Sequence, residues 1–509
     1  MGTPQARRIR ELSHRTVRGG LWLFGGTVGT NVARLGVTAA LARLVLPEEY
    51  GLNVEASVLL GLLAVAVEVG LGQAMIQRKD LLPQHESTSL TITLLVGAAS
   101  ALLLAGGASS WAAFRGIPAL TALLQILAIS LIFRATSSVP RMLMMRELRF
   151  KEVSVVQFAA FIAQSITSVA LAAAGYGALA LAWGAVAGSL VDASLTFQRR
   201  PIARPLDFHW ARGRELLSFG GGLTVARMAN TVALQSDNLV VGMALGPAAL
   251  GLYSRAYSVL AIPAGLLQSI DGALFTALAR LQDDVPQLRS AFRSGISLTA
   301  ALVIPISAFI TVMAPELVRC LMGPNWDGAV LPLQILAPTM FFRTAYKIAA
   351  VSVRAQGAVN LLAITQVSYA LSVVAGAFLG CRFGLAGAAV GVGCAVFFQY
   401  LFLVGAGARL LGLPVIRTLL PSYQPLLLGG TAAALTWGIS RLCGLAAVSS
   451  PLRLLFSGMA FLGLVGVARR VAPNKALGPE LVRVLDAAWR RVALVWGSRP
   501  AAPEPNSGH

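Results

Sequence analysis

Residues 89–110 read SLTITLLVGAASALLLAGGASS, a stretch without a single charged residue. A helix that crosses the hydrocarbon core of a bilayer needs about 20 mostly apolar residues. The apolar run is continuous and lacks the period-2 alternation of a strand in a membrane barrel. This stretch therefore predicts a transmembrane helix.

Apolar runs of similar length recur along the whole chain and predict an all-α polytopic membrane protein with about 14 transmembrane helices. The candidate segments are 19–45, 51–76, 89–110, 117–139, 153–174, 177–198, 216–245, 253–277, 295–314, 329–350, 360–380, 384–408, 425–446 and 450–468. The first and seventh are long enough to tilt or to extend beyond the bilayer.

The overall composition excludes other classes of protein. Of the 509 residues, 56% are hydrophobic and 12% are charged, whereas a soluble domain carries about 25% charged residues. A disordered chain would need low hydrophobicity. The net charge is +20, but the basic residues of a nucleic-acid binder lie on a polar surface, so we expect no nucleic-acid partner.

The basic residues indicate how the chain is oriented in the membrane. Lys and Arg concentrate in cytoplasmic loops, and with the N-terminus inside most of the 41 Lys and Arg fall in inside segments. The sequence therefore predicts a basic cytoplasmic tail (1–18), a basic cytoplasmic linker (199–215) and a cytoplasmic C-terminal tail (470–509). That tail carries an amphipathic pattern, typical of a helix on the inner leaflet or of one packed on a cytoplasmic loop, and a disordered end.

An internal repeat divides the chain into two lobes. Residues 46–52 read LPEEYGL and residues 246–252 read GPAALGL, while the triplet FGG occurs at 24–26 and again at 219–221. The repeat unit holds six helices, an even number, so both copies face the same way. We expect an N-lobe (19–198) and a C-lobe (216–408) related by an axis along the membrane normal, with 425–468 as two added helices.

The first helix of each predicted lobe carries one polar stripe. Such positions recur every three or four residues and share a narrow arc of the helix. The stripes are Thr27, Asn31, Arg34 and Thr38 in one lobe, and Thr224, Arg227, Thr231, Gln235 and Asn238 in the other. Because an intramembrane Arg is costly, the stripes predict a central cationic cavity. In the alternative, each Arg pairs with a nearby acid such as Glu55, Glu68 or Asp237.

Other charged residues within the segments are candidates with open alternatives. Arg343 and Lys347 lie one turn apart near the inner end of 329–350, where they snorkel to the headgroups or face the cavity. Arg255 lies at the outer mouth of 253–277. The acids Asp237, Asp271 and Glu68 are candidates for coupling to a cation, although pairing with a neighbouring base is the alternative.

The sequence lacks patterns for cofactor or metal chemistry. The cysteines Cys320, Cys381, Cys394 and Cys443 have no metal-ligand spacing, the histidines fall in tails or loops, and no GxxxxGK[ST] motif is present. We expect no cofactor, no metal site and no enzymatic activity.

Several short motifs, taken together, resemble one family. They are Gly70-Leu71-Gly72 with Ile76-Gln77-Arg78-Lys79, Arg146-Glu147-Leu148-Arg149-Phe150-Lys151, Ser236-Asp237-Asn238-Leu239-Val240-Val241-Gly242, Gly251-Leu252-Tyr253-Ser254-Arg255-Ala256-Tyr257, and Pro315-Glu316-Leu317 with Gly323-Pro324-Asn325-Trp326. From about residue 15 to 410 the chain resembles the polysaccharide-unit flippases (Wzx-type, the lipopolysaccharide and colanic-acid exporters). These belong to the multidrug/oligosaccharidyl-lipid/polysaccharide exporter superfamily.

The resemblance implies a two-lobed, alternating-access transporter in the cytoplasmic (inner) membrane of a bacterium. It would move a polyprenyl-diphosphate-linked oligosaccharide to the outer leaflet for lipopolysaccharide, exopolysaccharide or capsule biosynthesis. Its partners would be this substrate, membrane lipids, a polysaccharide polymerase and export machinery. Arg suits phosphate oxygens, so we expect Arg34 and Arg227 to hold the diphosphate and Asn31 and Gln235 to meet sugar hydroxyls.

Three other functions compete with this interpretation. A cation-coupled multidrug antiporter of the same superfamily would favour a cavity dominated by acids. A membrane polysaccharide polymerase or glycosyltransferase would need a sizeable outer loop or intramembrane catalytic acids, and the predicted outer loops are short. A membrane scaffold without transport would leave the paired polar stripes without a purpose.

Overall fold

The computed structural model describes residues 33–67, 75, 80–202, 207–280, 285–356, 358–419, 423–446 and 448–471. Within 217–227 and 264–280 it describes the backbone but not the side chains. The predicted N-terminal tail, the linker residues 203–206 and the tail beyond 471 lie outside these ranges.

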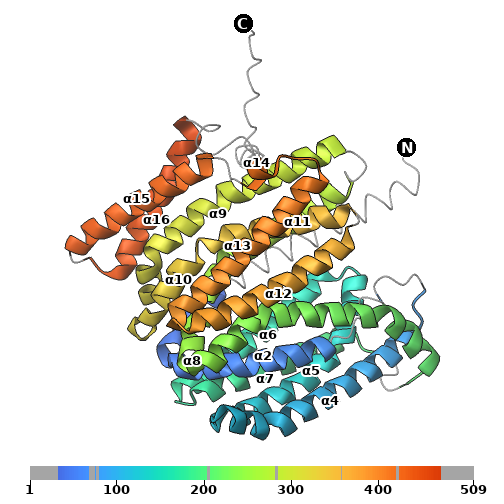
Figure 1. Ribbon diagram of the computed structural model, residues 1–509. Helices are drawn as coiled ribbons and strands as arrows, with labels where there is room; N and C mark the ends of the chain where they lie inside the picture. The colour runs from blue at the N-terminus through green and yellow to red at the C-terminus, as the bar shows by residue number, and fades with distance from the viewer. Residues whose placement is uncertain are drawn as a thin grey trace, which may run out of the picture. The chain divides into compact units, whose positions relative to one another are not determined.

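The described part of the chain is helical and contains no strand (Figure 1). Residues 33–44 form the described end of the first predicted segment. The further helices are α2 (Pro47–Val67), α4 (Pro83–Arg115), α5 (Ala119–Arg146), α6 (Phe150–Ala173), α7 (Ala178–Arg199), α8 (Trp210–Arg280), α9 (Val285–Leu321), the 3-10 turn η1 (Pro324–Ala329), α10 (Val330–Leu336), α11 (Thr339–Ala355), α12 (Val359–Cys381), α13 (Gly384–Leu410), α14 (Val415–Leu419), α15 (Tyr423–Leu445) and α16 (Ser450–Val471).

Eleven helices of the described part are long and apolar enough to cross a membrane. This confirms the all-α, multi-pass class, while the count of fourteen stays a prediction. The helix of the predicted segment 329–350 is interrupted in the structure, because α10 ends at Leu336 and α11 begins at Thr339. Pro338 stands at the break, where its ring and missing N–H prevent the helix from continuing.

The loop predicted between segments 216–245 and 253–277 is a single residue in the structure. Gly246 is the only position inside α8 with non-helical dihedrals (φ 84°, ψ 177°). A positive φ is accessible to glycine at little cost because it has no Cβ. The two halves of α8 fold back on one another there, since a Cβ added at Gly242 would lie 2.9 Å from a side-chain carbon of Leu250.

Contacts between residues divide the chain into two compact units. Unit 1 contains 1–262, 318–332 and 366–395, and unit 2 contains 263–317, 333–365 and 396–509. Unit 1 therefore combines the predicted N-lobe with three stretches of the predicted C-lobe.

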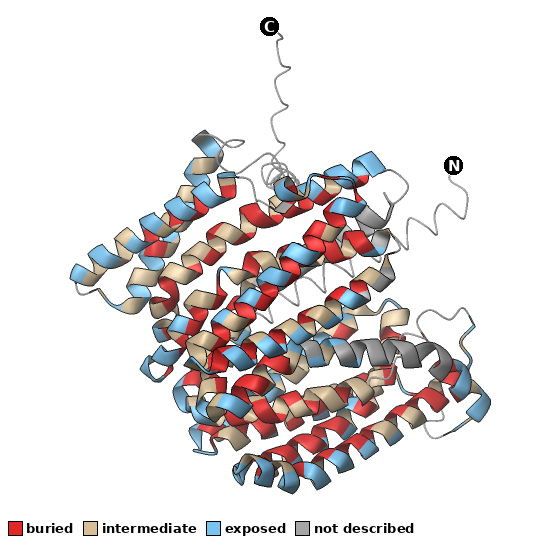
Figure 2. Ribbon diagram, in the orientation of Figure 1, coloured by how far each residue is buried: buried red, intermediate tan, exposed pale blue. Residues whose placement is uncertain are grey.

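The core of unit 1 forms where α5 packs against α2, α4 and α7. Its fully buried members include Leu120, Leu127, Leu131 and Ala135 of α5, and Figure 2 shows much red among these helices. Small residues allow close approach: a Cβ on Gly97 of α4 would lie 2.5 Å from that of Ala135. This packing of small against large side chains is typical of helices in lipid.

In unit 2, α15 and α16 form a hairpin that Figure 2 shows mostly in the colours of exposed and intermediate residues. Only 6% of the apolar window of α16 is buried, as expected for a helix that faces lipid. Contacts to α9 hold the hairpin. Phe309 packs against Phe461, and Ser440 donates a hydrogen bond to the buried Glu316 carboxylate (2.7 Å).

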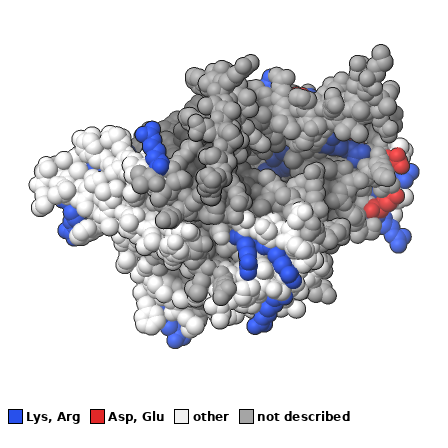
Figure 3. Space-filling model, turned by 90° about the horizontal axis from the view of Figure 1, so that it is seen from above, with Lys and Arg blue, Asp and Glu red and all other residues white. Residues whose placement is uncertain are grey.

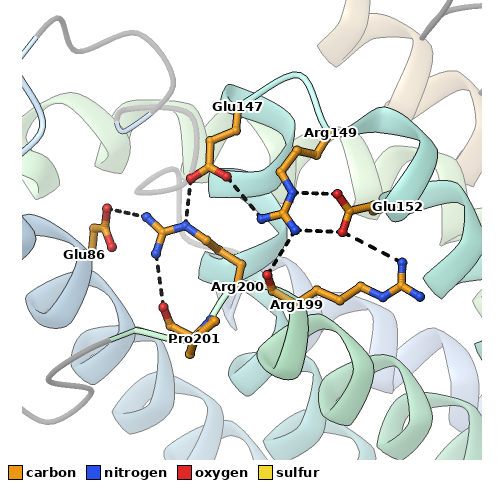
Figure 4. Close-up of polar contacts among 7 residues, drawn as sticks. All are labelled: Glu86, Glu147, Arg149, Glu152, Arg199, Arg200 and Pro201. Atoms are coloured by element: carbon orange, nitrogen blue, oxygen red, sulfur yellow. Dashed lines mark hydrogen bonds and ion pairs between the residues drawn. The ribbon is translucent and has the colours of Figure 1, made fainter.

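The predicted inner loops of unit 1 meet in a charged network (Figure 4). Arg200 donates to Glu86 of α4 (2.9 Å) and to Glu147 after α5 (2.7 Å), and Arg149 donates to Glu152 of α6 (2.7 and 2.8 Å). The hydrogen bond to Glu152 raises the pKa of Arg149 above its usual value. Burial lowers the pKa of Arg200, but the hydrogen bond to Glu147 and the other nearby carboxylate outweigh burial and raise it. The network ties together the ends of α4, α5, α6 and α7.

Candidate functional site

The two copies of the sequence repeat contact each other in unit 1. A Cβ added at Gly51 of α2 would lie 1.8 Å from the carbonyl oxygen of Pro247, and one added at Gly251 of α8 would lie 1.9 Å from the carbonyl oxygen of Pro47. The contact is reciprocal, since each glycine meets the proline of the other copy. We call these four residues the glycine crossing. The glycine crossing lies at the start of α2 and at the turn within α8, which are both predicted outer ends.

Local sequence explains why both helices begin here. Pro47 is the first residue of α2, a position where the fixed φ of proline suits a helix and its missing N–H is not needed. The carboxylate of Glu49 accepts a hydrogen bond from the backbone N–H of Leu46 (3.0 Å) and so caps the first turn. Pro247 plays the corresponding part after the turn at Gly246.

Arg255 lies one turn beyond Gly251 and is only 4% exposed. Its guanidinium carbon is 3.8 Å from the ring centroid of Tyr50 and 5.5 Å from that of Trp326. Its Nε is buried and has no hydrogen-bond partner within the described structure. Ring faces attract a guanidinium without accepting its N–H groups as a carboxylate would, which leaves the Nε–H without an acceptor among the described residues.

Trp326 fixes segment 318–332 against the described end of the first helix. The indole is fully buried, and its Nε1 donates to the carbonyl of Ala42 (2.7 Å). Its ring meets that of Tyr50 edge-on at 5.9 Å. Nearby, Arg43 donates to the carbonyl of Cys320 (3.3 Å). We call Tyr50, Arg255 and Trp326 the arginine stack.

A buried ion pair joins α2 and α4 beside the glycine crossing. Arg115 donates through Nε to Glu55 (2.7 Å), and the indole of Trp111 donates to the same carboxylate (3.1 Å). The guanidinium also donates to the carbonyls of Gly242 and Met243, where the first half of α8 ends. A cation there satisfies the last carbonyls of a helix and complements its dipole.

The second polar stripe continues inward from the arginine stack. Tyr253 donates its hydroxyl to the buried Asp237 carboxylate (3.1 Å), and Asn238 donates to the side-chain oxygen of Gln235 (2.9 Å). Thr231 is half-buried on the same helix. The structure thus joins Gln235 and Asn238 of the predicted stripe through a side-chain hydrogen bond, and it places Asp237, which was not part of the stripe, against Tyr253.

The first polar stripe is described only in part. Arg34 has an exposed side chain whose guanidinium carbon lies 6.0 Å from the ring centroid of Phe161, and Thr38 is half-buried. Glu55 was a candidate partner for an intramembrane Arg of the stripes, but the structure pairs it with Arg115. Outside the described residues lie Thr27, Asn31 and Glu68, together with the side chains of Thr224, Arg227 and Asp271.

Arg343 and Lys347 belong to α11 in unit 2, where both are half-buried. They follow each other by one turn, as predicted. The choice between a cavity role and snorkelling stays open, because these two residues and the arginine stack belong to different units.

Charge is distributed unevenly on the surface. On the face drawn in Figure 3, basic side chains predominate over acidic ones among the described residues.

An exposed ion pair lies within segment 318–332, where Arg319 donates a hydrogen bond to Asp327 (2.9 Å). This hydrogen bond lowers the pKa of Asp327 below its ordinary value.

No group of three or more His, Cys, Asp or Glu able to hold a metal ion occurs within the described ranges. His85 is buried in the first turn of α4, where its Nδ1 accepts the backbone N–H of Leu82 (3.0 Å). That contact satisfies the helix start and gives His85 a structural role.

The sequence alone did not single out three of these residues. The sequence predicts Arg115 only as a basic residue at a predicted outer loop. Tyr50 and Trp326 lie within stretches whose side-chain contacts the sequence does not predict. Tyr50 stands inside the repeated stretch 46–52, so the repeat itself was the available signal.

Comparison with known proteins gives relatives named for the biosynthesis or transport of polysaccharides. The chain is 25% identical over 340 residues to the lipopolysaccharide biosynthesis protein WzxC of Escherichia coli (strain K12), with 65% of this chain and 68% of the relative covered. It is 25% identical over 322 residues to the succinoglycan biosynthesis transport protein ExoT of Rhizobium meliloti (strain 1021), with 62% and 64% covered. The match thus spans about two thirds of each relative.

Solved structures share the fold at low identity. The lipid II flippase MurJ in an inward closed conformation has a TM-score of 0.67 at 14% identity, over 88% of this chain and 99% of that one. A multidrug resistance MATE family transporter in an inward-facing conformation has a TM-score of 0.63 at 14% identity, over 75% and 94%. The family model described as polysaccharide biosynthesis protein matches residues 40–331, a range that contains the glycine crossing, the arginine stack and the buried ion pair. These findings confirm the resemblance seen in the sequence, and the chain belongs to the polysaccharide biosynthesis protein family.

Proposed function

We propose that this protein is a flippase that moves a polyprenyl-diphosphate-linked oligosaccharide unit from the inner to the outer leaflet of the cytoplasmic membrane. The family match over residues 40–331 carries the proposal. Relatives named for lipopolysaccharide biosynthesis and succinoglycan transport support the substrate class. The fold shared with a lipid II flippase supports transport of a lipid-linked sugar.

The proposed architecture is two six-helix lobes (19–198 and 216–408), two added helices (425–468), and both termini in the cytoplasm. The reciprocal contact of Gly51 and Gly251 with Pro247 and Pro47 supports two lobes of the same orientation. The gathering of predicted inner loops at one end of unit 1 supports the alternation of the helices. A polymerase and export machinery are the proposed partners.

Cationic side chains are the proposed binding groups for the diphosphate. Arg255 is buried against aromatic rings without a carboxylate on its Nε, and Arg34 is exposed on the first helix. Arg227, Arg343 and Lys347 complete the proposed set from the sequence pattern. Desolvating a diphosphate is costly, and guanidinium groups repay that cost through charge-assisted hydrogen bonds.

The test is reconstitution of the full chain in liposomes that contain a fluorescent polyprenyl-diphosphate-linked oligosaccharide. A membrane-impermeant quencher added outside should destroy about half of the fluorescence without protein and nearly all of it with protein, because a bilayer has two leaflets and the flippase lets lipid exchange between them. Equal quenching with and without protein contradicts the proposal.

The same liposomes test the antiporter alternative. Uptake of a lipophilic cation driven by a proton or sodium gradient, without lipid translocation, would assign the protein to drug transport instead. A polymerase or glycosyltransferase would lengthen the glycan, which mass spectrometry of the recovered lipid detects.

A further inference from the structure

The repeated stretch found at 46–52 and 246–252 contains none of the side chains proposed to bind the diphosphate. The structure nevertheless places both copies in contact, because the glycine of each copy lies against the backbone carbonyl of the proline in the other. We propose that the glycine crossing and the arginine stack form an outer seal, which closes the transport path toward the outside and parts during each cycle. The inference rests on the proposed function, since alternating access requires a closure on each side.

The first argument is the closeness of the crossing. Carbonyl oxygens of Pro47 and Pro247 occupy the places where side chains at Gly251 and Gly51 would stand. Two helices that approach this closely exclude water and headgroups between them. Because each copy contributes one proline and one glycine, the contact has the symmetry of the sequence repeat and lies on the axis between the two predicted lobes.

The second argument concerns which parts of the predicted C-lobe belong to unit 1. The parts of the predicted C-lobe within it are 216–262, 318–332 and 366–395. Each contains one predicted outer turn, at Gly246, at 318–328 or near Arg382. The predicted inner connections of the same lobe, around 281–294, 351–359 and 409–424, belong to unit 2. The C-lobe is therefore joined to the N-lobe through its outer turns.

The third argument concerns the chemistry of the contacts that cross between the predicted lobes. Trp326 and Arg43 reach across with hydrogen bonds between a side chain and a backbone carbonyl, and Arg255 stacks on Tyr50. Arg115 reaches the carbonyls of α8 while its charge stays paired with Glu55 inside the N-lobe. When these contacts separate, no ion pair between the described side chains is broken. Opening therefore does not incur the free-energy cost of leaving two buried charges without their partners.

The seal predicts the effect of a methyl group at the crossing. Gly51→Ala and Gly251→Ala should each hold the outer end open, because the new Cβ overlaps a backbone carbonyl that cannot move alone. Gly61→Ala is the matched control: Gly61 lies on the same helix as Gly51, and a Cβ there meets nothing within 4 Å.

A cysteine below the crossing reports the opening. Val54 follows Gly51 by three residues on the same helix face, and Val54→Cys is introduced after the four native cysteines are replaced by serine. A membrane-impermeant maleimide added to intact cells should label this cysteine about tenfold faster in Gly51→Ala and Gly251→Ala than in the parent or in Gly61→Ala, because labelling follows the open population. Equal labelling of all four proteins overturns the inference.

A second measurement leaves both glycines intact. Arg43→Cys is combined with the native Cys320, whose carbonyl Arg43 contacts, while the other three cysteines are replaced. A short bifunctional thiol reagent with an internal disulfide should lock the seal, stop lipid translocation, and release it on reduction. The same protein with Cys320→Ser is treated as the control.

The outcomes separate the two proposals. Unchanged translocation after complete cross-linking shows that the crossing is a permanent joint and overturns the seal. If the parent protein moves no lipid, the proposed function fails, and the labelling of Val54→Cys still decides whether the outer end opens.

Discussion

Arg115 and Glu55 join α4 and α2 through an ion pair whose acid is only 2% exposed. The carboxylate also accepts the indole N–H of Trp111, and the guanidinium also reaches the carbonyls at the end of the first half of α8. The pair therefore links α2, α4 and the first half of α8 without leaving a buried charge uncompensated.

Glu55→Gln should strongly destabilise the protein, since it leaves the half-buried Arg115 without its acid. Removing one partner of a buried pair typically costs about 3–5 kcal/mol. Thermal unfolding in detergent measures the effect, and the double variant Glu55→Gln/Arg115→Gln should lose less than the sum of the two single changes. Simple additivity would show that the two residues do not interact.

Trp326→Phe should destabilise the outer segment while it keeps an aromatic ring beside Arg255. The change leaves the carbonyl of Ala42 without its donor, and an unsatisfied buried group costs about 1–3 kcal/mol. Limited proteolysis within 318–332 should become faster. Trp437→Phe is the control, because Trp437 is 56% exposed and its loss should leave the rate unchanged.

Arg255→Gln should abolish lipid translocation, and Arg255→Lys should retain part of it, because an ammonium keeps the charge but lacks the planar fork that suits phosphate. Arg441→Gln provides the control. Arg441 also stacks on an indole, with its guanidinium carbon 5.4 Å from the ring centroid of Trp437, but it is exposed. Equal rates for Arg255→Gln and the parent would remove Arg255 from the binding groups.

Arg34→Ala and Arg227→Ala should each stop export of the polysaccharide yet leave the protein inserted in the membrane. Each change removes a proposed ligand of the diphosphate but no predicted span. Export is measured by the glycan that reaches the cell surface, and insertion by the amount of protein in washed membranes. Full export by both single variants would contradict their proposed role.

The pair of Arg319 and Asp327 should add a small stability that disappears in acid. The pKa of Asp327 is lowered, so the contribution is present above the unfolded value of about 3.9 and is lost as the pH falls through the folded value. For an exposed pair it amounts to less than about 1 kcal/mol. The difference in melting temperature between the parent and Asp327→Asn should stay constant from about pH 8 to 5 and vanish at lower pH; a difference that persists in acid would assign it to another cause.

Much of the fold could be predicted from apolar length, because a bilayer demands helices of about 20 residues. The details that escaped prediction are governed by single residues. Pro338 divides an apolar run that looks continuous by hydropathy, and Gly246 turns the chain within one residue where a loop was expected. Neither effect changes the hydrophobic pattern from which the segments were predicted.

The candidate site could be predicted only in part, because helical spacing shows which residues share a face but not what that face meets. Gln235 and Asn238 share a face by their spacing and are hydrogen-bonded in the structure, whereas the contact of Asp237 with Tyr253 did not follow from spacing. The partner of Glu55 could not be derived, since Arg115 lies on another helix and its pairing depends on how α2 and α4 pack. Likewise, the burial of Arg255 depends on Trp326, far along the chain.

The glycine crossing also constrains how this sequence can evolve. Because the contact is reciprocal, the same steric demand acts at two positions that are distant in the chain. A side chain at either glycine would displace the carbonyl of the other copy. A substitution at one site therefore changes what the other site can hold, and among homologous chains the two positions should lose or keep glycine as a pair.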